Sequence, residues 1–213
     1  MATTITTTTT EAAGMEWESD PAAIYRASFA AIRAEVALDG VPPDLHDLVI
    51  RVVHACGMPD IVADMAWSNG AGTVGRTALA AGAAILVDAE MVSHGVIRRK
   101  LRGNRVVCTL NEVTEHAGTT RSAAAVELWR ETLPGAVVAI GNAPTALFRL
   151  LDLLAEGWPR PALILGFPVG FVGAAESKQA LAGSGLPFVT LHGRRGGSAM
   201  AAAAVNALAG GLE

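Results

Sequence analysis

The strongest constraint on the fold is a regular alternation, from Thr73 onward, of short apolar runs with helical patterns. The runs are rich in β-branched residues and apolar at consecutive positions, which is typical of parallel strands buried on both faces. The predicted strands are Ala84–Val87, Arg105–Leu110, Ala136–Ile140, Ala162–Leu165 and Phe188–Leu191. The helices that separate or follow them are Ser122–Thr132, Pro144–Ala155, Ala174–Ala182 and Ser198–Ala209. This order predicts an α/β fold with three α/β/α layers around a doubly wound, mainly parallel sheet of about five strands.

Two more helices are predicted before this alternation. Asp20 is a suitable N-cap for a helix that the spacing of apolar residues extends from Pro21 to Leu38. A second amphipathic pattern runs from Asp44 to Cys56, and Gly57 after it is a helix stop signal. Residues 61–72 fit neither a helix nor a strand.

The chain is expected to form one domain, residues 20–213, behind a tail. Residues 1–19 begin with a Thr-rich tract that lacks a basic start and an apolar centre, so they predict a disordered tail and not a signal peptide. No apolar run reaches the roughly 18 residues that a membrane span needs. Cys56 and Cys108 are too few for a disulfide framework, so a reduced, cytoplasmic setting is expected. The net charge of −4 disfavours a nucleic-acid partner.

Three glycine-rich loops follow predicted strands directly, at residues 141–145, 166–173 and 193–198. In open α/β sheets, ligands bind beyond the carboxyl ends of the strands. Glycine allows a ligand to approach the backbone closely, and the N-termini of the following helices offer N–H groups to anions. We therefore expect a ligand with several carboxylates at this edge. The alternative is that these glycines only make tight turns.

Several polar side chains are expected near the same edge. Asn142 lies in the first loop, Arg121 begins a predicted helix, and Lys178 follows the second loop. Asp88 and Glu90 come directly after another strand, where they form either a carboxylate pair or a cap for the next helix.

His54 is the candidate proton-transfer group. It lies in the last turn of the second helix, where the helix dipole favours the imidazolium, whereas Arg51 one turn earlier opposes that charge. The sequence does not decide which effect sets the pKa. A histidine that titrates near neutrality suits proton transfer, and a purely structural histidine on an apolar helix is the alternative. Cys56 points to a different face of the helix, which disfavours a Cys–His nucleophile pair.

The loop at 166–173 imitates a dinucleotide-binding fingerprint. Pro168 occupies the place of its first glycine, however, and no acidic residue stands about 20 positions later to bind a ribose. A nucleotide-dependent oxidoreductase is therefore an alternative that this loop supports weakly.

The motifs and their order resemble the precorrin-8X methylmutase family of cobalamin biosynthesis. The resemblance extends over about residues 20–210, and Arg51–Gly57 (RVVHACG) and Gly166–Lys178 (GFPVGFVGAAESK) are its most specific segments. The other matching segments are Ile24–Phe29, Leu86–Val92, Thr120–Ala125, Ala139–Phe148 and Gly196–Met200.

The resemblance implies a flavodoxin-like fold, a homodimer, and an isomerase that acts on a corrinoid precursor without metal or other cofactor. The reaction would be a methyl shift on ring C that converts precorrin-8X to hydrogenobyrinate, or the cobalt-precorrin-8 equivalent to cobyrinate. His54 would be the proton donor and acceptor, and Ser28 and Arg51 would contact the substrate. Arg121, Asn142 and Lys178 are further expected substrate contacts. A non-catalytic corrinoid carrier is a second alternative.

Overall fold

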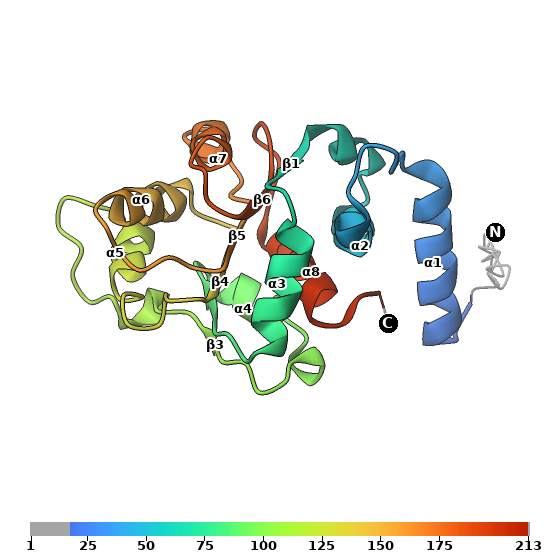
Figure 1. Ribbon diagram of the computed structural model, residues 1–213, viewed down its shortest axis with the longest axis horizontal. Coiled ribbons are helices and arrows are strands. Elements are labelled where there is room, and N and C mark those ends of the chain that lie inside the picture. Colours follow the sequence, from blue (N-terminus) through green and yellow to red (C-terminus); the bar gives the residue numbers. More distant parts are fainter. Residues whose placement is uncertain (1–17, 213) are drawn as a thin grey trace, which may run out of the picture.

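The sheet of the computed structural model, which describes residues 18–212, has six strands in the order β1-β6-β5-β4-β2-β3 (Figure 1). The strands are β1 (Met65–Trp67), β2 (Ile85–Val87), β3 (Val106–Val107), β4 (Val137–Ile140), β5 (Leu163–Gly166) and β6 (Phe188–Leu191). All neighbours are parallel except β1 and β6, which are antiparallel with Met65 opposite Leu191. Without β1, the order is that of flavodoxin-like folds. The predicted fold class is confirmed.

The expected number of five strands was wrong, because β1 adds a sixth at the edge beside β6. It is only three residues long, and its pairing joins segments more than a hundred positions apart. Neither the length nor the long-range pairing leaves a periodic pattern in the sequence, so residues 61–72 fitted no regular element.

Helices cover both faces of the sheet. Alternate strand residues point to opposite sides, so each face has its own apolar side chains to bury. Val137 and Ala139 pack into one core with helices α2, α3, α4 and α8, whereas Val138 and Ile140 pack into a second core with α5, α6 and α7. Figure 1 shows α1 outside α2, on the side away from the sheet. The helices are α1 (Pro21–Glu35), α2 (His46–Cys56), α3 (Ala71–Ala80), α4 (Glu90–Gly95), α5 (Arg121–Glu127), α6 (Pro144–Ala155), α7 (Ala174–Ala182) and α8 (Ser198–Gly210). Short 3-10 helices are η1 (Pro43–Leu45), η2 (Pro59–Asp64), η3 (Arg98–Lys100) and η4 (Leu110–Glu112).

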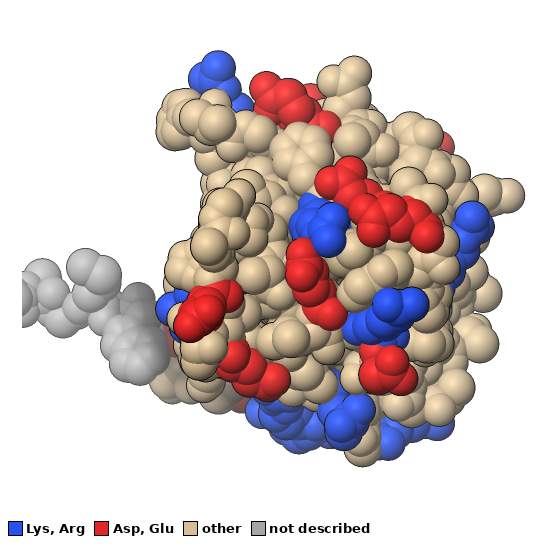
Figure 2. All heavy atoms as spheres, turned by 90° about the vertical axis from the view of Figure 1, so that its left-hand side faces the viewer, with Lys and Arg blue, Asp and Glu red and all other residues tan. Residues whose placement is uncertain are grey.

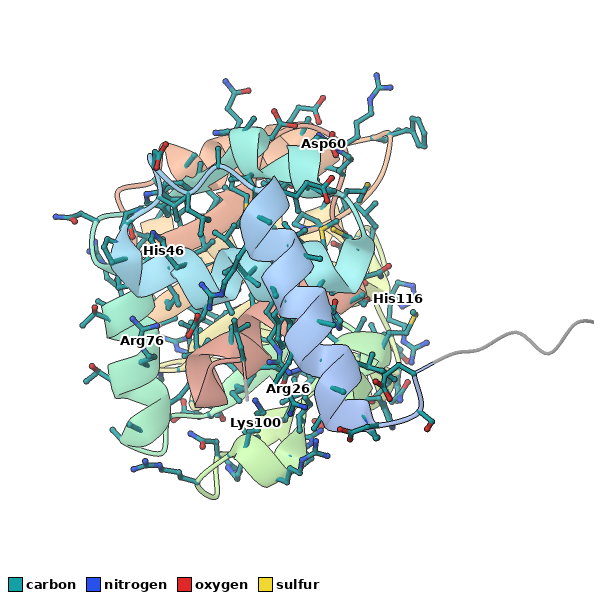
Figure 3. All side chains as sticks on the ribbon, turned by 90° about the vertical axis from the view of Figure 1, so that its right-hand side faces the viewer. Arg26, His46, Asp60, Arg76, Lys100 and His116 are labelled. Carbon is teal, nitrogen blue, oxygen red and sulfur yellow. The ribbon has the colours of Figure 1, made fainter. Side chains whose placement is uncertain are left out.

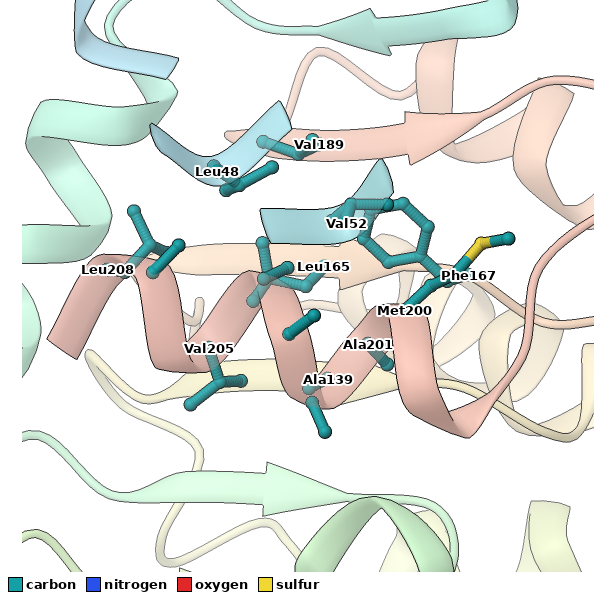
Figure 4. Packing of buried hydrophobic residues seen from close by; sticks show 14 of the residues in the cluster. Leu48, Val52, Ala139, Leu165, Phe167, Val189, Met200, Ala201, Val205 and Leu208 are labelled. Atoms are coloured by element: carbon teal, nitrogen blue, oxygen red, sulfur yellow. The ribbon is translucent and has the colours of Figure 1, made fainter. Parts of the chain in front are cut away.

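Helix α8 is the centre of the first core. Its residues from Met200 to Leu208 are all buried, and most of them are alanine. Figure 4 shows this helix in front of the strands and beside α2, whose Leu48 and Val52 lie in the same cluster as Val189 and Phe167. Because alanine is small, α2 packs close to α8, and this places the C-terminal end of α2 beside the carboxyl ends of the strands.

The predicted helices are found where they were expected, with shorter ends for three of them. Helix α2 begins at His46 and not at Asp44, because residues 43–45 form η1. Helix α1 ends at Glu35 and α5 ends at Glu127. Helix α3 was missed because its Gly72 and Gly75 weaken the apolar pattern. Gly75 is needed there, because a Cβ would meet the side chain of Leu208 at 2.7 Å.

The N-terminal tail predicted for residues 1–19 lies almost wholly outside the described residues, which begin at residue 18. Within the described residues, no helix has both the length and the apolar character to cross a bilayer.

Candidate active site

The site is built where α1 crosses α2. Asp20 caps α1 by accepting hydrogen bonds from the backbone N–H groups of Ala22 and Ala23. Helix α2 ends at Gly57, whose φ of 67° allows its N–H to close the last turn on Val53. These two signals fix the ends of both helices, and the crossing brings side chains of α1 against the last turn of α2.

Ser28 of α1 and His54 of α2 are joined by a hydrogen bond. Ser28 Oγ lies 2.8 Å from His54 Nδ1. The other ring nitrogen, Nε2, has no hydrogen-bond partner among residues 18–212. The imidazole is exposed, so Nε2 is the nitrogen that a ligand can reach.

Two aromatic side chains of α1 hold the imidazole ring. The ring centroids of Tyr25 and Phe29 lie 5.7 and 5.0 Å from that of His54. Phe29 is buried, whereas Tyr25 is partly exposed. Their spacing of one helical turn places both residues on one face of α1, but nothing in the sequence alone marks that face as part of the site.

Burial and a neighbouring cation both lower the pKa of His54 below its ordinary value of 6.5. Desolvation is the larger cause and the charge of Arg51 is the second. Both causes favour the neutral form of the ring. The imidazolium of His54 is consequently a stronger acid than that of a free histidine.

Arg51 is buried beside this group. Its Nη1 donates a hydrogen bond of 2.8 Å to the carbonyl of Gly211, and its guanidinium lies 5.9 Å from the centre of the Phe29 ring. The structure thus brings Ser28, Arg51 and His54 together, as the sequence analysis expected.

Arg121 is the first residue of α5, and Asn142 lies in the loop after β4. Arg121 donates to the Leu110 carbonyl and to Asn111 Oδ1, at 2.8 and 2.7 Å. The side chain of Asn142 is exposed, and its backbone N–H donates to Asp88. Both residues remain expected substrate contacts without a described contact to His54.

Asp88 does not cap the helix that follows it, because α4 has no side-chain cap, and it binds the loop before α6 instead. Its carboxylate accepts three backbone N–H groups, those of Gly141, Asn142 and Ala143, at 2.8, 3.0 and 2.7 Å. Burial raises the pKa of this carboxyl, and these hydrogen bonds counteract the rise. The expectation that the N–H groups of this loop are free to bind a substrate carboxylate was therefore wrong, because Asp88 already uses them.

Lys178 is fully buried, and burial lowers its pKa to about 8. Its Nζ donates a short hydrogen bond to the carbonyl of Arg195. The loops at 166–173 and 193–198 are also joined directly, because Gly197 donates to the carbonyl of Phe167. A contact between Lys178 and a substrate stays a prediction. It requires that the loop at 193–198, which holds the Lys178 amine, first move away.

The two cysteines are weak candidates for nucleophilic chemistry. Burial raises the pKa of the Cys56 thiol, and it raises that of Cys108 to about 11. The thiolate is the reactive form, so both groups are poorly reactive near neutral pH. Among residues 18–212, no group of three or more His, Cys, Asp and Glu side chains is placed to hold a metal ion.

Next to the Ser28–His54 pair lies a cavity of about 670 Å³ between α1, α2, η3 and the C-terminal residues. Tyr25, Phe29 and Arg51 contribute to its wall, so it adjoins the residues around His54. The walls of this cavity come from four separate segments of the chain, so no local sequence pattern predicts it.

Comparison with known proteins identifies the family to which the chain belongs. Residues 23–210 match the protein family described as precorrin-8X methylmutase. The chain is 63% identical over 203 residues to a Pseudomonas aeruginosa protein of that name, with 92% of this chain and 98% of that protein covered. It is 55% identical to a precorrin-8X methylmutase of Sinorhizobium sp., covering 89% and 94% of the two chains. The crystal structure of a precorrin-8x methyl mutase from Thermus thermophilus superimposes with a TM-score of 0.81 at 40% identity, covering 88% of this chain and 94% of that one.

Proposed function

Because this chain belongs to the precorrin-8X methylmutase family, we propose that His54 exchanges a proton with a corrinoid precursor while a methyl group moves on its ring C. The chain is an intramolecular isomerase of cobalamin biosynthesis. The observation that supports the role of His54 is the hydrogen bond between Ser28 Oγ and His54 Nδ1, which leaves Nε2 open to a ligand.

The proposed step begins with protonated His54. Nε2 gives its proton to a nitrogen of the macrocycle, and the conjugated system becomes electron-poor. The methyl group then leaves one carbon of ring C and bonds to a neighbouring carbon of the same ring. When the ring nitrogen returns its proton to Nε2, substrate and product differ only in the position of the methyl group. Atoms and electrons balance without a co-reactant.

Ser28 supports this cycle by accepting a hydrogen bond from Nδ1–H of His54. In this arrangement the Nδ1 proton stays in place while Nε2 gains and loses its own. The lowered pKa of His54 favours the first transfer, because a stronger acid protonates a weakly basic ring nitrogen more readily.

Arg51 and Ser28 are the proposed substrate contacts nearest His54. Arg51 suits one of the substrate carboxylates, because a guanidinium binds a carboxylate through two parallel hydrogen bonds. Arg121 and Asn142, exposed at the strand ends, are proposed to contact more distant parts of the substrate.

We propose the metal-free precursor as the natural substrate, a homodimer as the working form and the cytoplasm as its location. The first is supported by the name precorrin-8X that the relatives from Pseudomonas aeruginosa and Sinorhizobium share. The homodimer rests on the family resemblance. The location is supported by Cys56 and Cys108, which are both free thiols.

The decisive experiment incubates the purified protein separately with precorrin-8X and cobalt-precorrin-8, and follows the absorbance and the mass. Conversion gives a product of unchanged mass with a different visible spectrum. A change of mass, or a strict need for nicotinamide, would contradict the isomerase mechanism. Binding without any spectral change would instead favour the carrier. Sedimentation of the same sample measures the oligomeric state.

A further inference from the structure

The cavity beside Arg51 combines apolar walls with a cluster of cations. Its apolar surface comes mainly from Tyr25, Phe29, Ile97 and Leu212. The cations that line it are Arg26, Arg33, Arg51, Arg99 and Lys100. Figure 3 looks onto α1 and shows Arg26 and Lys100 close together near the N-terminal end of that helix. We name this feature the arginine cavity.

The charge of the arginine cavity is opposite to that of the whole chain. Among residues 18–212, no acidic residue lines it, although the protein carries a net charge of −4. On the face formed by α5, α6 and α7, in contrast, acidic and basic side chains are interspersed (Figure 2). A concave site that gathers one sign of charge against apolar walls concentrates ligands of the opposite sign.

The cations of the cavity differ in the partners that they already have. Arg33 donates a hydrogen bond to Asp47 at 3.1 Å, and Arg26 lies 3.7 Å from Asp20. Arg51 donates to the neutral carbonyl of Gly211.

Arg99 has no ion pair or side-chain hydrogen bond within residues 18–212, and it is exposed. Arg51 and Arg99 line the same cavity, so two like charges face one space. Burial is the main cause that lowers the pKa of Arg51, and the charge of Arg99 lowers it further. An anion between Arg51 and Arg99 would relieve this repulsion.

We propose that the arginine cavity receives carboxylate arms of the corrinoid precursor and that Arg99, together with Arg51, binds one of them. This inference rests on the proposed function and extends it to a binding residue outside the Ser28–His54 pair. Tyr25 and Phe29 connect the two places, because both contact the His54 ring and line the cavity. A macrocycle packed against these aromatic rings has its apolar body near His54 and its charged arms toward Arg99.

The test compares Arg99→Gln with Arg105→Gln as a matched control. Both replace an exposed arginine of the same basic segment, but Arg105 does not line the cavity. The measurement is the dissociation constant for hydrogenobyrinate, obtained by spectral titration at low and high salt. We expect Arg99→Gln to weaken binding about tenfold or more, as for the loss of a hydrogen bond between charged groups. The control is expected to bind like the wild type, and the salt dependence is expected to be smaller in Arg99→Gln.

A second titration uses hydrogenobyrinate whose carboxylates have been converted to carboxamides. The wild type is expected to bind this neutral compound more weakly, and Arg99→Gln is expected to cause little further loss. Equal affinity of the wild type and Arg99→Gln for the acid form would overturn the assignment of the cavity. Failure of the wild type to bind hydrogenobyrinate at all would overturn it as well.

These outcomes are separate from the fate of the proposed function. If the wild type converts precorrin-8X and Arg99→Gln binds unchanged, the isomerase function stands and only the binding role of the arginine cavity is rejected. If the wild type does not convert precorrin-8X but Arg99→Gln binds tenfold more weakly, the isomerase function is rejected and the arginine cavity remains a corrinoid-binding site.

Discussion

Ser28 and His54 come from different helices, and the 2.8 Å between Ser28 Oγ and His54 Nδ1 fixes the direction in which the imidazole faces. The pair depends on the angle at which α1 crosses α2, so the orientation of the proton-transfer group is set by helix packing.

Removal of the Ser28 hydroxyl is therefore expected to slow the reaction without abolishing it. In Ser28→Ala the imidazole loses one neutral hydrogen bond and can turn, so kcat/KM should fall by about tenfold or less. Ser28→Thr keeps a hydroxyl and should recover much of the activity. The ¹⁵N chemical shifts of His54 report the position of the ring proton. Unchanged shifts and rates in Ser28→Ala would show that the hydrogen bond has no positioning role.

Replacement of His54 is expected to remove turnover and leave the fold intact. The side chain is exposed, so its loss in His54→Ala opens no buried cavity. Proton transfer by a placed side chain commonly contributes about 10²–10⁴-fold, and kcat should fall by an amount of that order. The melting temperature is the control for folding. A rate within a few-fold of the wild type, on folded protein, would exclude the role of His54.

The pH dependence of kcat/KM should have a descending limb that reports His54 in the free enzyme. The reaction needs the protonated ring, so activity is highest below the pKa of His54 and is lost as the pH rises through it. Since burial and Arg51 lower that pKa, the midpoint should lie below 6.5.

The contribution of Arg51 to this limb can be isolated in Arg51→Met, which removes a charge and keeps apolar bulk. The pKa of His54 should rise and the limb should move to higher pH, although burial continues to hold the pKa down. NMR titration of the His54 ring measures the shift directly. A midpoint above 6.5 in the wild type, or a shift to lower pH in Arg51→Met, contradicts this account.

Asp88 is expected to be a stability residue. Asp88→Ala leaves the N–H groups of Gly141, Asn142 and Ala143 without their acceptor in a largely buried place. The free energy of unfolding should decrease by about 3 kcal/mol, as for other losses of buried hydrogen-bond partners. Glu90→Ala is the control, with a change of roughly 0.5 kcal/mol or less, because Glu90 is partly exposed. Urea denaturation of both variants makes the comparison.

The parts of the fold that the sequence predicts well are those with unbroken apolar patterns. Strands β4 to β6 and helix α7 lie where continuous runs and clear stop signals placed them. Strand β1 was not predicted because its three residues are too few to form a periodic pattern. Helix α3 was not predicted because its glycines weaken the apolar pattern.

The site was predicted in part for a related reason. His54 and Arg51 share one helix, so their proximity follows from helical spacing. The partnership with Ser28, in contrast, depends on how α1 packs, and only the family resemblance pointed to it. The burial of Lys178 was not foreseen, because lysines are rarely fully buried. The arginine cavity could not be predicted, because its cations belong to separate segments of the sequence.

The bond from Arg51 to the Gly211 carbonyl, with Leu212 in the cavity wall, ties the chain's end to the active-site helix. A tag or fusion partner that displaces residues 211 and 212 would therefore disturb the cavity wall and remove the hydrogen bond that holds Arg51. A C-terminal tag would be a source of artefactually weak substrate binding that resembles the Arg99→Gln phenotype.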